Sequence, residues 1–505
     1  MRFLTPRDPN PAALGLRGAG VLQCPMRYYS TRSKSESASF AGAALAGLAP
    51  DGGLFVPSEL PEYSAAALSS LGSMDYRDIA FETIRPFVKG EMPDAELEGI
   101  VRAAYPFGAP LVPVGDRLVL ELFHGPTAAF KDFGARFMAR AFAWLRRGED
   151  RPLRILVATS GDTGGAVADG FFGVPGIFVT VLYPKGRVSP LQERQIAGFG
   201  GANGACNISA LAVEGSFDDC QRLAKAALSG EGPAAALKKR AELSSANSIN
   251  IARLIPQAAY YAAAAGKAFA GKADPDGAAT PRAAPGGGGA KSGAASGASA
   301  GAAPERRLPR RGEPIALCVP SGNFGNLTAG LYAMKMGAPI RRFLAATNAN
   351  RAVPDYLDSG EYRAAASQAT ISNAMDVGAP SNFERMAAHF SLEEMRRAIA
   401  GVWVTDGETR EAIARVHAQD GYFLDPHSAV GWKGADKLAA LGKIGGGQVA
   451  VLSTAHPAKF AETVEPLAGP APMPESLASA MQRDVNARTI PADLGALAAA
   501  LLEDC

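Results

Sequence analysis

Excess charge of either sign is nearly absent from this 505-residue sequence, which has 51 Lys and Arg against 49 Asp and Glu and a formal net charge of +2. That balance gives no electrostatic reason to expect nucleic acid or an anionic membrane as a partner. Long apolar runs are missing as well, since none approaches the ~20 residues that a membrane-spanning helix needs. We therefore expect no nucleic-acid partner and no membrane partner.

Cysteine is also scarce. The five cysteines are odd in number and scattered without metal-ligand spacing: Cys24, Cys206, Cys220, Cys318 and Cys505. This usage predicts reduced thiols in a cytoplasmic protein and gives no indication of a metal site. A chain of this length is too long for one compact core and should divide into two or three domains.

The first 25 residues differ from the rest in being basic, poor in acidic residues and interrupted by Pro9 and Pro11. Transit peptides are also basic and poor in acids, but little serine is present here and the prolines oppose an amphipathic helix. A start placed too far upstream, with Met26 as the true beginning, explains the segment at least as well. We expect residues 1–25 to be a disordered extension, and organellar import through them stays open.

Hydrophobic periodicity indicates how the remainder is organised. Residues 26–112 are expected to be mostly helical, with a turn at 51–57 that leads into a short strand. Buried strands then alternate with helices, which is typical of parallel sheets covered on both faces. The predicted strands cover residues 154–158, 177–182, 315–319 and 448–452. A Gly-, Ala- and Pro-rich tract at 268–312 cannot bury enough apolar surface and is predicted to be disordered.

Lys131 stands out within the stretch Glu121–Gly134, directly behind Gly125-Pro126 and at the start of a predicted helix. Apolar residues at 130, 133, 137 and 141 give that helix one buried stripe, which would anchor the lysine among aromatic side chains. Desolvation there would favour a neutral, nucleophilic amine suited to forming a Schiff base. The commonest aldehyde cofactor is pyridoxal phosphate. An ordinary surface lysine is the alternative.

Three predicted strands lead into loops rich in Gly, Ser, Thr and Asn, where open parallel sheets bind ligands. Residues 320–326 precede a helix predicted over 327–336, and such a loop can hold an anion through backbone N–H groups; a plain turn is the alternative. Residues 159–164 precede a helix expected near Gly165, and there Asp162 could be a simple N-cap. The third loop is 453–457. Pro457 suits the first position of a helix, and His456 is predicted to be structural rather than catalytic.

A fourth string, 244–253, ends in Arg253, whose planar guanidinium can bind phosphate at two points. An exposed helix residue is the ordinary alternative for Arg253. Lys185 and Arg187 are weaker candidates for phosphate binding, because a solvated turn explains them.

The stretch 121–134 and the string 320–326 resemble those of the threonine synthase family, and the resemblance covers nearly everything outside 1–25 and 268–312. It implies the α/β fold of the tryptophan-synthase-β type (fold type II), with parallel-rich sheets flanked by helices, and pyridoxal phosphate on Lys131. It also implies cofactor contacts through Gly322, Asn323, Phe324, Asn326, Thr454 at the pyridine nitrogen and Asp162 near the 3′-oxygen. Ser160 and Thr163 would face the substrate, and Asn247, Ser248 and Arg253 would hold its phosphate.

The same resemblance implies a domain order. We expect an N-terminal domain at 26–112 and a small mobile domain at 151–225. The large cofactor domain would comprise 113–150, 226–267 and 313–470, followed by a C-terminal helical segment at 471–505. The implied activity is conversion of O-phospho-L-homoserine and water to L-threonine and phosphate, the last step of threonine biosynthesis. The sequence leaves open whether the enzyme is a monomer or a homodimer.

Other functions stay open at this point. A related phospho-lyase would share the phosphate site, a serine or threonine dehydratase would not need one, and a non-catalytic ligand-binding relative would not need Lys131.

Overall fold

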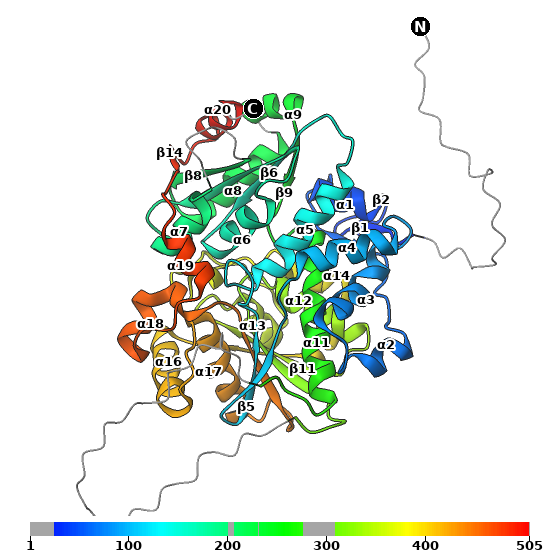
Figure 1. Ribbon diagram of the computed structural model, residues 1–505, viewed down its shortest axis with the longest axis vertical. Coiled ribbons are helices and arrows are strands. Elements are labelled where there is room, and N and C mark those ends of the chain that lie inside the picture. The colour runs from blue at the N-terminus through cyan, green and yellow to red at the C-terminus, as the bar shows by residue number, and fades with distance from the viewer. Residues whose placement is uncertain (1–24, 200–206, 231, 276–308, 504–505) are drawn as a thin grey trace, which may run out of the picture.

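The computed structural model describes residues 25–199, 207–230, 232–275 and 309–503, arranged around two large sheets. Figure 1 shows the five-stranded sheet in the upper half of the molecule and the six-stranded sheet in the lower half. This parallel-rich α/β architecture confirms the predicted fold class. Among the described residues, no helix is both long and apolar enough to cross a bilayer.

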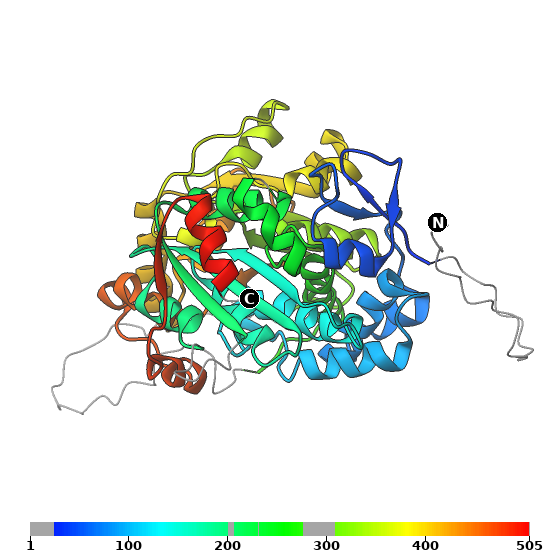
Figure 2. The same cartoon turned by 90° about the horizontal axis from the view of Figure 1, so that it is seen from above.

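All pairings in the five-stranded sheet are parallel, in the order β14-β8-β7-β6-β9. Its strands are β6 (Leu153–Ala158), β7 (Ile177–Pro184), β8 (Ile208–Glu214), β9 (Glu242–Ser245) and β14 (Arg488–Pro491). Helices α6 (Asp162–Phe171) and α7 (Pro190–Ala197) lie on one side of it, and α8 (Phe217–Ser229) and α20 (Leu494–Glu503) lie on the other. In Figure 2, α20 is the red helix beside these strands. Because both faces are covered, β6 and most of β7 consist of buried residues, as predicted for continuous apolar runs.

The six-stranded sheet has the order β12-β11-β10-β13-β5-β4 and is parallel except for the hairpin between β4 and β5. Its strands are β4 (Leu111–Val114), β5 (Arg117–Glu121), β10 (Ile315–Pro320), β11 (Ile340–Thr347), β12 (Ile399–Trp403) and β13 (Val449–Ser453). Helices α11 (Ala258–Phe269) and α12 (Gly325–Lys335) cover one face, while α16 (Asp406–Asp420) and α17 (Pro426–Ala440) cover the other. All four strands predicted from the sequence are therefore confirmed.

The N-terminal region packs beside the helix that carries Lys131. It contains a small antiparallel sheet of β1 (Tyr28–Ser30), β2 (Ser37–Ala38) and β3 (Phe55–Pro57). Its helices are α1 (Phe40–Ala46), α2 (Ala65–Ser70), α3 (Tyr76–Val88) and α4 (Asp94–Ala104). These helices agree with the mostly helical character predicted for residues 26–112, and α4 packs on α5 (Lys131–Leu145).

Some sequence-based boundaries need correction. Residues 242–245 are predicted to belong to the large domain, but they form β9 and pair with β6 of the five-stranded sheet. The polar residues Ser244 and Ser245 give this strand no apolar pattern from which it could be predicted. The segment 471–505 is not purely helical, because β14 follows α19 (Glu475–Met481) and pairs with β8; only Ile490 of that strand is buried. Helices α6 and α12 also begin a few residues earlier than predicted.

The predicted disordered tract 268–312 begins too early. Helix α11 continues to Phe269, and the carboxylate of Asp274 lies 2.6 Å from the Lys267 amine and accepts the Leu111 N–H. These bonds hold a segment whose composition alone suggested disorder. Residues 276–308 and the N-terminal extension 1–24 lie outside the described residues, and the division into domains stays a prediction.

Candidate active site

One cavity is lined by segments that follow the carboxyl ends of strands in both sheets. Nine of the residues predicted from the sequence line it: Lys131, Asp162, Ser248, Arg253, Gly322, Asn323, Phe324, Asn326 and Thr454. A larger cavity of about 430 Å³ contains none of them. Because an amine, an arginine and a glycine-rich loop meet in the first cavity, the chemistry places the candidate site there.

Lys131 is the first residue of α5, and its Nζ lies 4.4 Å from the centre of the Phe130 ring. Phe133, Phe137 and Ala141 are buried as the helical stripe predicts, which fixes α5 in the core. Burial and the nearby Arg253 lower the pKa of Lys131 to about 8, against an opposing effect of Asp162. This amine therefore loses its proton more readily than an ordinary lysine, and only the neutral form can act as a nucleophile or base.

The turn before Lys131 is held in an unusual backbone conformation. Ala128 has φ of +53°, a region that costs a residue with a side chain about 1–3 kcal/mol. Asp132 is fully buried and accepts hydrogen bonds from the N–H (2.9 Å) and hydroxyl (2.6 Å) of Thr127. The Phe130 N–H donates to the Thr454 carbonyl at 2.9 Å. These bonds tie the turn to the end of β13, so the position of Lys131 is fixed from two sides.

The loop after β10 has the second strained residue. Phe324 has φ of +58° and stands before α12 without a side-chain cap. Ala128 and Phe324 are the two non-glycine residues with positive φ among those described, and each lies in a loop of this cavity. The first turn of a helix leaves N–H groups without intrahelical partners. The start of α12 therefore offers an electropositive cradle for an anion.

Side chains of the same loop hold its shape. Asn323 Nδ2 donates to Ser248 Oγ at 2.6 Å, and Asn326 Nδ2 donates to the Pro320 carbonyl at 3.0 Å. At Gly325, a Cβ atom would lie 3.2 Å from Asn382 Nδ2 and 3.4 Å from Ser248 Cβ, so a side chain would crowd the cradle. Glycine keeps that space open for a ligand.

A second anion-binding group enters the cavity from the segment after β9. Arg253 is 1% exposed, and its Nη1 donates to the Ala246 carbonyl. Its Nε is buried without a hydrogen-bond partner among the described residues. Burial lowers the pKa of Arg253 to about 10, with Asp132 opposing, so the guanidinium stays charged. The interpretation of Arg253 as an exposed helix residue is wrong, because the helix stands inside the fold.

Asp162 is not an N-cap. The cap position of α6 is Gly161, with φ of +139°, and it makes no side-chain cap bond. The Asp162 carboxylate instead lies 2.7 Å from Lys459 Nζ and accepts a 3.0 Å hydrogen bond from Gln192 Nε2. Burial alone would raise the pKa of Asp162, but Lys459, with His427 and Gln192, holds it below its usual value. An ionised carboxylate therefore faces the cavity that contains Lys131.

Sequence reasoning missed a histidine in the cavity. His427 lies on the first turn of α17, with Nδ1 2.9 Å from Asp425 Oδ1, and Nε2 accepts the Ala374 N–H at 3.1 Å. Ser428 accepts the Thr454 N–H at 3.1 Å. Asp425-Pro426 is a recognisable helix start, which could have placed His427 on that turn. Nothing local indicates that the turn lies beside Lys131.

Three predicted substrate residues do not line the cavity. Ser160 and Thr163 lie in the loop and first turn between β6 and α6, and their roles stay predictions. The Asn247 amide is occupied elsewhere, because it donates to the Ala158 carbonyl at 2.7 Å and accepts the Ala158 N–H at 3.2 Å. Asn247 thus fixes the end of β6 to the 244–253 segment.

The weaker candidates also lie elsewhere. Lys185 forms an exposed ion pair with Glu214 at 3.3 Å, and exposed Arg187 lines the larger cavity. His456 is buried, and its Nδ1 accepts the Ala458 N–H at 3.2 Å. Burial lowers the pKa of His456 to about 3, so it stays neutral and structural, as expected.

These residues fit pyridoxal phosphate, whose aldehyde needs an amine and whose phosphate needs an anion cradle within the same cavity. Lys131 supplies the amine, and the loop before α12 supplies the cradle. Thr454 adds a hydroxyl in the same cavity.

Three family models match successive parts of the chain. Residues 27–105 match the model described as "Threonine synthase N terminus", and residues 115–455 match "Pyridoxal-phosphate dependent enzyme". Residues 428–501 match "Threonine synthase, C-terminal". Together they cover the N-terminal region, both large sheets and the C-terminal elements.

Individual proteins give the same result. Threonine synthase of Escherichia coli K12 is 38% identical over 475 residues, which is 94% of this chain and 98% of that protein. Threonine synthase of Saccharomyces cerevisiae is 32% identical, with 86% and 88% covered. The crystal structure of the E. coli enzyme matches with a TM-score of 0.79 at 37% identity, covering 95% of this chain and 100% of that one. A pyridoxal-phosphate-bound threonine synthase from Brucella melitensis matches with a TM-score of 0.78 at 34% identity, covering 95% and 99%. The resemblance and the cofactor predicted from the sequence are thereby confirmed, and the chain belongs to the threonine synthase family of pyridoxal-phosphate-dependent enzymes.

Proposed function

We propose that the chain converts O-phospho-L-homoserine and water to L-threonine and phosphate, as a lyase in threonine biosynthesis. The observation that carries this substrate is a second cationic group in the cavity, separate from the cradle before α12. Arg253 is buried and charged, and its Nε has no partner among the described residues. A buried unpaired guanidinium nitrogen is costly unless a ligand supplies an acceptor, and a phosphate oxygen does so well.

The cavity then has two phosphate sites, one at the cradle before α12 and one at Arg253. Backbone N–H groups of residues 322–326 hold the cofactor phosphate, and Arg253 with Ser248 holds the substrate phosphate. The two sites are in contact, because Ser248 Oγ accepts the Asn323 amide. The reacting carbons are therefore placed between a fixed phosphate and the Lys131 amine.

Pyridoxal phosphate, when bound, supplies an electron sink for the carbon next to the substrate nitrogen. Lys131 provides the base: its lowered pKa lets it accept the Cα proton and later return one. With the cofactor bound, Thr454 would offer a hydroxyl, rather than a carboxylate, to the pyridine nitrogen, and the Asp162 carboxylate would be the group near the 3′-oxygen. Loss of a proton from Cβ expels the phosphate from Cγ, and Arg253 stabilises the negative charge that grows on the departing group. A proton then adds at Cγ, which becomes the methyl group of threonine, and water adds at Cβ.

The products test this proposal. Incubating the enzyme with O-phospho-L-homoserine should release threonine and inorganic phosphate in equal amounts, measured by chromatography and a phosphate assay. Release of phosphate with 2-oxobutyrate would favour the related phospho-lyase instead. Absence of free phosphate would contradict both, and dehydration of serine or threonine alone would identify a dehydratase.

The pKa of Lys131 predicts how the apoenzyme recovers its cofactor. A neutral amine attacks the aldehyde, so the rate of recombination with pyridoxal phosphate should rise with pH, with a midpoint near 8, and level off above it. An ordinary lysine would give a midpoint near 10.4. Stopped-flow absorbance between pH 6 and pH 10 measures this, and a rate still rising steeply at pH 10 would contradict the burial of the amine.

Two further expectations remain proposals. We propose that the enzyme is a monomer or homodimer and that it works in the cytoplasm. Sedimentation of the purified protein and fractionation of cells test the two points separately.

A further inference from the structure

Lys459 is a buried lysine to which neither the sequence nor the proposed reaction gives a role. It lies on the short 3-10 helix η4 (Pro457–Phe460), which follows β13 of the six-stranded sheet. Its side chain is 0% exposed. Lysine is rarely buried so completely without a partner, because removing an ammonium group from water is costly.

The partners of the Lys459 amine lie in the two loops that shape the candidate site. Nζ is 2.7 Å from Asp162 Oδ1, at the start of α6, and donates to the Thr127 carbonyl at 2.8 Å, in the turn before Lys131. Two side-chain amides of α7 donate to the same partners. Gln192 Nε2 donates to the Asp162 carboxylate at 3.0 Å, and Gln195 Nε2 donates to the Thr127 carbonyl at 3.1 Å. One ammonium group therefore joins the six-stranded sheet to the helices of the five-stranded sheet.

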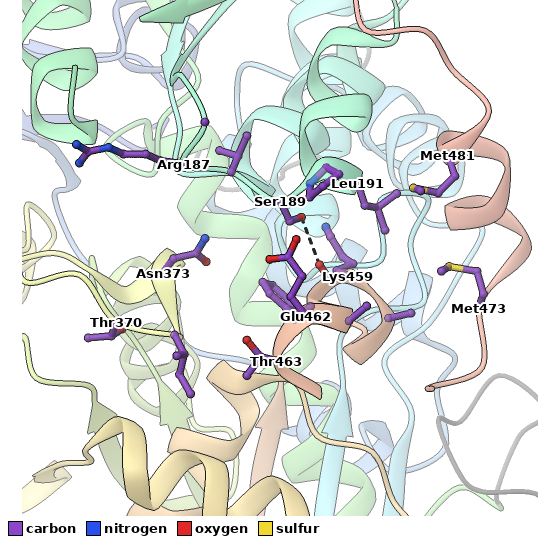
Figure 3. Close-up of a pocket in the computed structure, with 17 residues that line it drawn as sticks. Arg187, Ser189, Leu191, Thr370, Asn373, Lys459, Glu462, Thr463, Met473 and Met481 are labelled. Carbon is purple, nitrogen blue, oxygen red and sulfur yellow. Dashed lines mark hydrogen bonds between the residues drawn. The ribbon is translucent and has the colours of Figure 1, made fainter. Parts of the chain in front are cut away.

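The other side of Lys459 faces the larger cavity, of about 430 Å³ (Figure 3). Ser189 in the same wall donates to the Lys459 carbonyl at 3.3 Å, as the dashed line in Figure 3 shows. Exposed Arg187 and Met473 also line this cavity, so it reaches the surface. A lysine beside such a space normally extends its ammonium group to water. Its inward direction here indicates that the Asp162 carboxylate holds it.

We propose that Lys459 is a positioning residue, which holds the Asp162 carboxylate in its charged form against the cavity that contains Lys131. The proposal rests on Lys131 being the cofactor lysine and concerns the residue that sets its electrostatic environment. Burial raises the pKa of Asp162, and without Lys459 only His427 and Gln192 would counteract that rise. The Asp162 carboxylate would then take up a proton. Lys131 would then lose a negative neighbour that counteracts burial and Arg253, and would hold its own proton less tightly.

The test uses Lys459→Met, Asp162→Asn and the double variant. Lys443→Met serves as the matched control, because Lys443 pairs with Asp358 at 3.6 Å on the exposed surface. The pH midpoint of apoenzyme recombination with pyridoxal phosphate is measured for each protein. Lys459→Met and Asp162→Asn should each lower the midpoint by roughly one pH unit, and the double variant should shift it no further, because both act through one carboxylate. The control should keep the wild-type midpoint.

An unchanged midpoint in Lys459→Met, or shifts that add in the double variant, would overturn the proposal. If the Lys131→Ala apoenzyme recombined with pyridoxal phosphate like the wild type, the assignment of Lys131 as the cofactor lysine would be wrong. Thermal unfolding then tests the Lys459–Asp162 ion pair independently of that assignment. Each single variant leaves one buried ionisable group without its partner, so its melting temperature should fall, and the double variant should recover part of the loss.

The same comparison decides the case in which Lys459→Met does not fold. Recovery of folded protein in the double variant would then support the pair. A double variant that fails to fold, alongside a folded Asp162→Asn protein, would contradict it.

Discussion

Replacing Lys131 with alanine is expected to lower kcat by at least about 10³-fold and to abolish the visible absorbance that pyridoxal phosphate acquires when joined to an amine. Lys131 is the amine lining the cavity and the proposed base at Cα, so one substitution removes two functions. The fold should survive, because α5 is anchored by Phe133, Phe137 and Ala141 rather than by Lys131. Steady-state kinetics, absorbance spectra and thermal unfolding measure the three effects.

Lys443→Ala is the control for this experiment, since it removes a lysine from an exposed ion pair and should leave kcat unchanged. Adding a small primary amine to Lys131→Ala should restore part of the activity, because it replaces the missing base. A Lys131→Ala enzyme that kept its colour and full activity would contradict the assigned role.

Replacing Arg253 with alanine is expected to lower kcat/KM for O-phospho-L-homoserine by roughly 10²–10³-fold. Two charge-assisted hydrogen bonds to a phosphate contribute about 3–4 kcal/mol together, and each 1.4 kcal/mol corresponds to about tenfold. Arg253→Lys keeps the charge but loses the planar two-point geometry, so its activity should fall between those of the alanine variant and the wild type. Steady-state kinetics with the phosphorylated substrate measures the series.

Arg187→Ala is the matched control, because Arg187 is exposed and lines the larger cavity instead of the candidate site. It should leave kcat/KM within about threefold of the wild type. Arg253 also bonds the Ala246 carbonyl, so thermal unfolding and cofactor affinity must be measured beside the kinetics. Unchanged kcat/KM in a folded Arg253→Ala enzyme would contradict a substrate phosphate at this site and favour a dehydratase.

Much of the site could be predicted because its loops are local in sequence. Strand β10 leads directly through residues 321–324 into α12, and the resemblance of the string 320–326 was enough to assign the cradle. The stretch 121–134 likewise contains Lys131 together with the turn that orients it. Where a strand, a loop and a helix follow one another within a few residues, the carboxyl-end rule for parallel sheets places them correctly.

What was missed depends on contacts between distant parts of the chain. Lys459 and Asp162 pair across almost 300 residues, and neither sequence neighbourhood reveals the other. His427 reaches the cavity because α17 packs on the six-stranded sheet. The Asn247 amide looked free for a ligand, but the end of β6 occupies it. Strands β9 and β14 were missed for the same reason, since their pairing with β6 and β8 stabilises segments that lack a strong local pattern.

The covalent position of the cofactor tests the account most directly. Borohydride reduces the carbon–nitrogen double bond between a cofactor aldehyde and a protein amine, so proteolysis and mass spectrometry can then locate the pyridoxyl group. We predict a single modified peptide with the group on Lys131. A group found on Lys459 or on any other lysine, or a reduced protein with no modified peptide, would contradict the assignment on which the proposed reaction depends.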